Sequence, residues 1–210
     1  MTAPLLSILI PYTLDRQYEY DNLYQRLITL GVNTEKYKGV VEEISDFAGK
    51  DMTIGEKRER MYKCANGVYS WQIDCDDDIS DDSIERILEA IKFSLSLSKP
   101  ISCITFQEAV SINGVKYKSN HSLSYPDWEG DGSKELSDWF HFHRTPFMKS
   151  VILTDIAKSI PIPYIRWGED HQWSQAIKPY LKNEIHIESD IYLYNHISTN
   201  PTERYGLDRE

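Results

Sequence analysis

Apolar residues in the first half of the chain follow two patterns, short continuous runs and longer stretches with helical spacing. Residues 5–10 are a mostly apolar run ended by Pro11, which predicts a buried strand. Residues 20–30 carry apolar side chains at helical spacing and are followed by Gly31, which predicts a helix that ends at this glycine. Similar short runs predict further strands at residues 40–44, 68–73 and 102–106.

Residues typical of helix starts lie between these strands. Thr53 and Glu56 match a capping box, so we expect a helix that starts after Thr53 and ends near residues 66–67. Ser80 is the predicted N-cap of another helix, in which apolar residues keep helical spacing over residues 84–95. Each predicted helix therefore separates two predicted strands.

The order of these elements predicts the fold class. Strands alternate with helices, which indicates an α/β domain with a mixed, mainly parallel sheet flanked by helices and joined by right-handed crossovers. Asn113 and Gly114, between β-prone flanks, predict a type I′ hairpin. Residues 119–138 form a long polar connection, whose aromatic side chains either stack on sugars or pack the loop against the domain. These aromatics, within or beside the loop, are Tyr125, Trp128 and Trp139.

Composition narrows the functional classes. The net charge of −10 over 210 residues disfavours nucleic acid as a partner. No apolar run reaches the roughly 18 residues of a membrane-spanning helix, and the start of the chain lacks the basic and apolar parts of a signal peptide. The three cysteines are odd in number and lack metal-ligand spacing, which fits a reducing compartment. We therefore expect a cytoplasmic protein, in the host cytoplasm if it is viral.

The densest cluster of charge follows the strand predicted at residues 68–73. Asp74, Asp76, Asp77 and Asp78 place four carboxylates within five positions, which is costly unless a cation binds there. In an extended backbone alternate side chains share a face, so Asp74, Asp76 and Asp78 are expected to converge. Such oxygen ligands suit Mg²⁺ or Mn²⁺ together with substrate phosphates. The alternative is a solvated acidic turn, or acids that favour the next helix start.

Other polar features map to the carboxyl ends of the predicted strands, where ligands bind in open α/β sheets. Pro11 and Tyr12 end the first strand, and Asp46 follows the second. Lys57 and Arg58 lie in the first turn of the capping-box helix, where free main-chain N–H groups and two cations suit a phosphate. The alternative is that both cations only solvate the helix. Together with the acidic cluster, they favour binding of a diphosphate and a metal.

Several motifs together resemble those of family-2-like glycosyltransferases with the GT-A fold. The matching segments follow the family's order and read T-I-G-E-K-R (53–58), A-N-G-V-Y (65–69), I-D-C-D-D (73–77), H-R-T-P (143–146) and W-G-E-D (167–170). Two positions depart from the family pattern. Glu59 follows Arg58 where Asn is common, and Arg144 follows His143 where Leu is common. These departures concern the roles of single residues and not the reaction class.

The resemblance implies a glycosyltransferase of the hexosyltransferase type. Such an enzyme moves a sugar from a nucleotide-sugar donor, usually a UDP-sugar, to a hydroxyl group of a glycan or glycoprotein acceptor, with Mn²⁺ or Mg²⁺ as cofactor. We expect a single domain over residues 1–210, with a nucleotide-sugar-binding half at 1–110 and an acceptor or catalytic half at 111–198. Residues 199–210 are expected to be a tail, or a linker in a longer multidomain chain.

The resemblance also implies a role for each matching residue. The donor-binding positions are Pro11, Tyr12, Asp46, Gly55, Lys57, Arg58 and Asp74. Asp76 is the implied direct metal ligand, and Asp74 holds the ribose or a metal-bound water. Asp170 is the implied acceptor-side base, with Glu169 beside it. His196 is a candidate for completing the metal coordination, although a histidine at a strand end is otherwise a structural residue.

Other chemistries remain as alternatives. His141 and His143 on one face of a strand suit Zn²⁺, but the sequence shows no third ligand. A nucleotidyltransferase needs a glycine-rich phosphate loop, and residues 10–17 contain no glycine. A glycosyltransferase acting on modified DNA bases needs a basic groove, which the net charge disfavours. A non-catalytic nucleotide-binding module predicts UDP binding without turnover.

Overall fold

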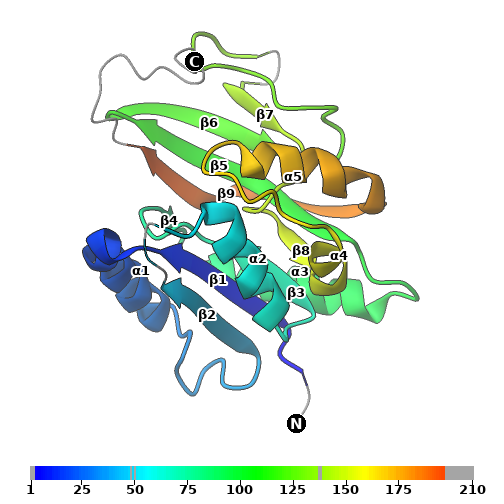
Figure 1. Cartoon of the computed structure of the whole chain (residues 1–210). Helices are drawn as coiled ribbons and strands as arrows, with labels where there is room; N and C mark the ends of the chain where they lie inside the picture. The colour runs from blue at the N-terminus through cyan, green and yellow to red at the C-terminus, as the bar shows by residue number, and fades with distance from the viewer. Residues whose placement is uncertain (1–2, 48, 50, 137–138, 197–210) are drawn as a thin grey trace.

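A mixed β-sheet with helices on both faces forms the centre of this computed structural model, which describes residues 3–47, 49, 51–136 and 139–196 (Figure 1). The strand order is β2-β1-β3-β8-β5-β6-β7, with β9 paired to β5 and β4 paired to β9. The longest ladders, β1 with β2 and β5 with β9, are parallel. The α/β class predicted from the sequence is therefore confirmed. The predicted tail or linker at residues 199–210 lies outside the described residues.

The elements have the following bounds. The strands are β1 Leu6–Tyr12, β2 Val41–Phe47, β3 Tyr69–Gln72, β4 Asp78–Ile79, β5 Cys103–Ile112, β6 Val115–His121, β7 Phe142–Arg144, β8 Val151–Leu153 and β9 Glu184–His196. The α-helices are α1 Gln17–Thr29, α2 Ile54–Cys64, α3 Ser83–Ser96, α4 Thr154–Ser159 and α5 Glu169–Ile177, and the 3₁₀ turns are η1 Leu14–Arg16 and η2 Lys178–Tyr180. Within the described ranges, no helix combines the length and apolar character needed to cross a membrane.

Strand β1 divides the protein into two hydrophobic cores because its side chains alternate between the two faces of the sheet. Leu6, Ile8 and Ile10 are buried in a core that also contains side chains of α1 and α3. Leu9 is buried in the opposite core, with side chains of α2, α4 and α5. The continuous apolar run seen in the sequence thus reflects burial on both faces. This arrangement leaves the strand ends open for a site.

Several local predictions are confirmed, and others are wrong. Thr53 caps α2, because its hydroxyl accepts the main-chain N–H of Glu56 at 3.2 Å. Asn113 and Gly114 have φ values of 49° and 82° and join β5 to β6, as expected for a type I′ turn. Pro11 does not end β1, since it pairs with Asp46 one position before the end of the strand. It is tolerated there near the strand's end, where fewer ladder bonds are needed.

The predicted helix start at Ser80 is also wrong. Asp82 is the N-cap of α3, and the Ser80 hydroxyl donates instead to the Asp82 carboxylate at 3.0 Å. The main-chain N–H of Ser80 donates to the carbonyl of Ile191 in β9 at 3.0 Å. The pairing of β4 with β9 therefore shifts the N-cap by two residues, from Ser80 to Asp82.

Candidate functional site

The carboxyl ends of β1, β2 and β3 lie side by side, as the sequence predicts (Figure 1). Pro11 and Tyr12 pair in register with Asp46 and Phe47. The Tyr12 ring stacks on Tyr20 of α1 with ring centres 4.1 Å apart and lies 5.4 Å from the Phe47 ring. Asp46 is buried, with one carboxylate oxygen 3.3 Å from Nε of Arg60. An aromatic surface and a buried carboxylate therefore meet at this edge.

Helix α2 turns its cations toward the sheet and not toward solvent. Lys57 and Arg58 are only 3% and 7% exposed, so the alternative that they merely solvate the helix is wrong. Burial lowers the pKa of Lys57, and the nearby carboxylates of Asp46 and Asp15 oppose this shift. Both cations sit on the same helix face as the buried Met61 and Tyr62 of the next turn. The helix therefore delivers two positive charges to the ends of the strands.

Arg58 connects two motifs from distant parts of the sequence, the acidic cluster after β3 and the W-G-E-D segment at residues 167–170. Its guanidinium donates to Gln72 Oε1 at 2.7 Å and to Asp74 Oδ1 at 3.0 Å, and its Nε lies 3.4 Å from Glu169 Oε1. Burial disfavours the charge, but Asp74, Glu169 and Asp170 outweigh it and hold the pKa of Arg58 above its usual value. The end of β3 and the start of α5 thus meet around one guanidinium.

Glu169 and Asp170 occupy different environments at the start of α5. Glu169 is 5% exposed, and burial raises its pKa to about 7, with Asp170 adding to the shift and Arg58 opposing it. Asp170 is half-buried, and its Oδ1 accepts the main-chain N–H of His171 at 2.8 Å. Glu169 is therefore a partner of Arg58, whereas Asp170 is the more accessible of the two carboxylates.

The acidic turn, residues Asp74 to Asp78, does not have the extended geometry that the sequence analysis expected. The main-chain N–H of Asp77 donates to the carbonyl of Asp74 at 3.0 Å, so the chain turns there. Asp76 pairs with Arg16 at 2.5 Å, and Asp78 lies 3.3 Å from Nε of Arg26. The expected extended geometry is therefore wrong, and Asp74, Asp76 and Asp78 each face a different arginine.

Asp77 is a member of the cluster to which the sequence analysis gave no role. Its carboxylate is buried and accepts hydrogen bonds from the Tyr192 hydroxyl at 2.7 Å and the Asn195 N–H at 3.0 Å. Lys149 lies 3.1 Å from the same carboxylate and 3.2 Å from Glu108. The sequence does carry a signal for this network, since Lys149 and Glu108 are charged residues inside mostly apolar segments.

The candidate site supplies some of the oxygen ligands that a divalent metal ion needs. Among the described residues, no three His, Cys, Asp or Glu side chains are grouped closely enough to hold a metal ion by themselves. Asp74 and Asp76 provide accessible carboxylates, with 27% and 39% of their side chains exposed. One or two carboxylates together with substrate phosphates are a usual Mg²⁺ site. These residues therefore fit a metal that the substrate helps to bind.

His196 lies apart from His141 and His143, the two histidines that the sequence offered as zinc ligands. His196 ends β9, one residue after Asn195, whose N–H reaches the acidic turn, and its ring stacks on Tyr194. His143 stacks on Tyr125 with ring centres 4.1 Å apart, whereas His141 packs edge-on against a tyrosine of β6. The end of strand β9 thus lies beside the acidic turn, and the two other histidines pack against aromatic rings.

Gly55 has a packing role in the structure. A Cβ atom at this position would lie 1.9 Å from the carbonyl oxygen of Pro163, so only glycine permits this approach. The segment touching Gly55 leads into residues 167–170. The glycine therefore lets the start of α2 lie against the chain that carries Glu169 and Asp170.

The long polar loop packs against α5. Trp128 contacts Phe147 and His171 edge-on, with ring centres 5.0 Å apart in both cases. Asp127 accepts hydrogen bonds from His171 at 3.0 Å and from Gln175 at 2.8 Å. The packing alternative is therefore correct for Trp128. The side chain of Trp139 is 78% exposed.

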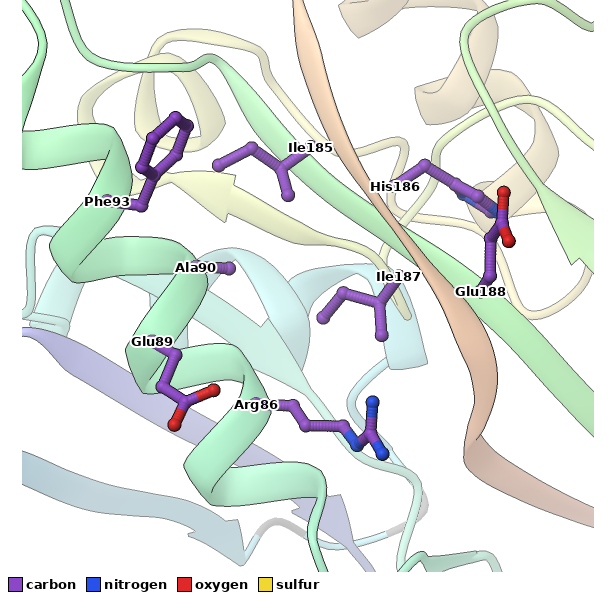
Figure 2. A pocket seen from close by; sticks show the side chains of 8 residues that line it. All are labelled: Arg86, Glu89, Ala90, Phe93, Ile185, His186, Ile187 and Glu188. Atoms are coloured by element: carbon purple, nitrogen blue, oxygen red, sulfur yellow. The ribbon is translucent and has the colours of Figure 1, made fainter.

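Two cavities differ in their relation to these residues. The larger, about 400 Å³, lies between α3 and β9 beside Phe93, Ile185 and Ile187 (Figure 2). Residues 185–187 pair with the beginning of β5, so this cavity is away from the strand ends. The smaller, about 200 Å³, lies between α1 and the acidic turn. The smaller cavity is the one that adjoins the candidate site.

Comparisons with known proteins support the same fold class. Neither a protein-family model nor a curated protein matches the chain. Among solved structures, S. aureus TarS 1–349 is similar with a TM-score of 0.57 and 12% identity, covering 90% of this chain and 60% of that one. Its complex with UDP-GlcNAc has a TM-score of 0.58 and 13% identity, and the match covers 93% of this chain and 59% of that one. Its complex with UDP has a TM-score of 0.56 and 13% identity, and the match covers 90% of this chain and 60% of that one. This likeness shows a fold of the α/β GT-A type, and the chain spans about 60% of the length of TarS 1–349.

Proposed function

We propose that this protein is a metal-dependent, family-2-like glycosyltransferase that moves a sugar from a nucleotide-sugar donor, a UDP-sugar, to a hydroxyl of a glycan or glycoprotein. The observation that carries this proposal is the junction at Arg58. It joins the acidic turn after β3 to Glu169, the first residue of α5. Donor and acceptor motifs distant in sequence therefore lie at one site, at the strand ends where α/β proteins bind ligands.

The donor side is assigned to the ends of β1 and β2 and the start of α2. Tyr12 and Asp46 lie in adjacent strands, where an aromatic ring and a carboxylate suit a nucleobase with N–H donors. Lys57 and Arg58 supply positive charge for a diphosphate at the N-terminus of α2. Two similar structures, which are complexes with UDP-GlcNAc and with UDP, support a uridine nucleotide as the donor group.

Asp76 and Asp74 would hold a Mn²⁺ or Mg²⁺ ion, with His196 as the candidate third protein ligand. Such an ion, when bound, neutralises charge on the leaving diphosphate. Asp76 is available for this role because its ion pair with Arg16 is exposed and exchangeable. Arg58 keeps the Asp74 carboxylate directed toward α2.

Asp170 is the proposed general base, which takes the proton of the acceptor hydroxyl. Its accessibility supports this choice, since the neighbouring Glu169 is buried against Arg58. A carboxylate within hydrogen-bond reach of the hydroxyl is sufficient for this step. Residues 1–110 and 111–198 would then form the donor and acceptor halves of the domain. We further propose a cytoplasmic location.

A panel of nucleotide sugars with Mn²⁺, read by release of the nucleoside diphosphate, tests the proposal. We expect release from one or more UDP-sugars, faster when a glycan acceptor is added. UDP binding without release from any donor would instead identify a non-catalytic nucleotide-binding module. Release that requires DNA carrying modified bases would identify the alternative acceptor.

A further inference from the structure

Lys149 is a buried cation at a point where separate segments of the chain meet. It lies between β7 and β8 and is 8% exposed. Its Nζ is 3.1 Å from Asp77 Oδ2 and 3.2 Å from Glu108 Oε1. The same atom lies 4.4 Å from the ring centre of Tyr192 and 3.8 Å from that of Tyr194. Two carboxylates and two aromatic rings therefore surround the ammonium group.

The main chain around Lys149 is fixed to β3, the strand that precedes the acidic turn. The indole N–H of Trp71 donates to the Lys149 carbonyl at 2.7 Å. The main-chain N–H of Gln72 donates to the Met148 carbonyl at 3.4 Å. The ammonium group is thus held at a set position relative to the turn.

Asp77 and Tyr192 attach the acidic turn to β9. The Tyr192 hydroxyl donates to Asp77 Oδ2 at 2.7 Å and accepts the main-chain N–H of Asp74 at 3.0 Å. The other Asp77 oxygen accepts the N–H of Asn195 at 3.0 Å. Asp74 and Asp77, the first and fourth residues of the turn, are therefore both bonded to the Tyr192 hydroxyl, and the Asp77 carboxylate is also bonded to Asn195.

The charges of this network depend on Lys149. Asp77 and Glu108 are both buried, and Lys149 is the cation that touches both. Removing one partner of a buried ion pair leaves an uncompensated charge, which is far more costly than removing both partners. Without the ammonium group, the buried Asp77 carboxylate would lose its cationic partner and move toward water. That movement would alter the turn.

We propose that Lys149 is a positioning residue of the donor site. By holding Asp77 inside the protein, it fixes the turn so that Asp74 and Asp76, on the same turn, are presented together to a metal-bound diphosphate. This inference rests on the proposed function. Lys149 itself is buried and touches neither donor nor metal in this account.

The test compares Lys149→Met with the double variant Asp77→Asn/Lys149→Met, which removes both charges of the Asp77–Lys149 pair and leaves Glu108 its contact with His121 at 3.1 Å. The double variant is expected to fold, because replacing both partners is tolerated better than leaving one. We expect its UDP affinity in the presence of Mn²⁺, measured by calorimetry, to fall about 10–100-fold, the usual cost of losing a residue that orients a ligand. Lys158→Met is the matched control, since this lysine contacts the carbonyl of Ala65 and not the turn.

Hydrogen exchange separates positioning from general stability. In the double variant the amides of residues 74–78 and 195 should exchange faster, whereas those of α2 should keep their wild-type rates. Unchanged UDP affinity, or affinity lost without faster exchange in the turn, would overturn the inference. If the wild-type protein binds no UDP, the proposed function fails. The exchange rates then decide alone whether Lys149 holds the turn.

Discussion

The inner and outer sides of the acidic turn balance their charges differently. On the inner side, Asp74 and Asp77 face Arg58 and Lys149, cations that are less than a tenth exposed. Breaking such a buried pair by removing one partner typically costs about 3–5 kcal/mol. The inner side is therefore part of the folded framework, and its carboxylates have fixed positions.

On the outer side, Asp76 and Asp78 face Arg16 and Arg26. The side chains of Asp76 and Arg16 are 39% and 50% exposed, and that of Asp78 is 52% exposed. Exposed pairs of this kind contribute about 0–1 kcal/mol, so a ligand can replace the arginine at little cost. The difference teaches that one run of aspartates has two uses: Asp77 holds the turn from inside, and Asp76 is open to a ligand. Asp74 is held by Arg58, but 27% of its side chain stays exposed.

The largest effect is expected outside the turn, at the proposed base. Asp170→Asn should slow sugar transfer about 10²–10⁴-fold, because the amide takes no proton from the acceptor. Its affinity for UDP should stay at the wild-type value, since the donor contacts lie on the turn and α2. Both quantities are measured on one preparation. Lost UDP affinity would place Asp170 on the donor side, and undiminished transfer would exclude it as the base.

The free energy of unfolding tests the contrast between the inner cation Arg58 and the outer cation Arg16 directly. Arg58→Met should lower the free energy of unfolding by about 3–5 kcal/mol, because Asp74 and Glu169 lose a buried partner. Arg16→Met, on the outer side, should lower it by about 0–1 kcal/mol. Urea unfolding measures both. Equal effects would remove the distinction between the two sides.

The raised pKa of Glu169, which contacts the inner cation Arg58, makes the free energy of unfolding depend on pH. The folded-state pKa of Glu169, raised to about 7 by burial, lies above the ordinary value of 4.5, so the folded protein binds the extra proton between these values. The free energy of unfolding should therefore fall as the pH rises through this window. In Glu169→Gln the free energy of unfolding should fall less over this pH window, by on the order of 1–3 kcal/mol. The lower figure allows for solvent screening and for the opposing charge of Arg58.

Urea unfolding at about pH 5 and about pH 7.5 measures this difference. Glu85→Gln is the control, because Glu85 is an exposed carboxylate paired with Lys36. A steeper pH dependence in Glu169→Gln than in the wild type would contradict the assignment.

The smallest effect is expected at Asp78. This residue lies outside the matched motif, and its Oδ1 accepts the N–H of Ile79 at 2.7 Å. Asp78→Asn should change stability by about 0–1 kcal/mol and leave metal-dependent UDP binding largely intact. Asp76→Asn should abolish that binding. If both variants bind UDP equally in the presence of Mn²⁺, the division of roles within the outer side is wrong.

The sequence predicted the parts of the site that depend on local rules. The cap at Thr53, the hairpin at Asn113 and the strand before the acidic turn follow from short-range preferences, and the structure confirms them. The grouping of Asp46 with Lys57 followed from the rule that parallel strands end at one edge. Local rules and one topological rule were therefore enough to predict which residues gather at the strand ends.

What the sequence did not reveal depends on long-range contacts. Asp74 and Asp76 look like alternating positions of a strand, but the chain turns between Asp74 and Asp77, and bonds to Tyr192 and Asn195 in β9 hold that turn. Lys149 reads as a single polar residue in an apolar segment, and its partners are more than 40 positions away. Tertiary contacts of this kind override local patterns, so the division into inner and outer sides required the structure.

The central claim is that Asp76 and Asp74 of the turn bind a metal together with the diphosphate of the donor. Calorimetric titration of the wild-type protein with UDP, in Mn²⁺ and then in EDTA, tests it most directly. We expect binding in Mn²⁺ that is lost in EDTA, and no binding by Asp76→Asn in either condition, because the carboxylate supplies an oxygen ligand that the amide replaces poorly. Equal UDP affinity with and without the metal would contradict the account.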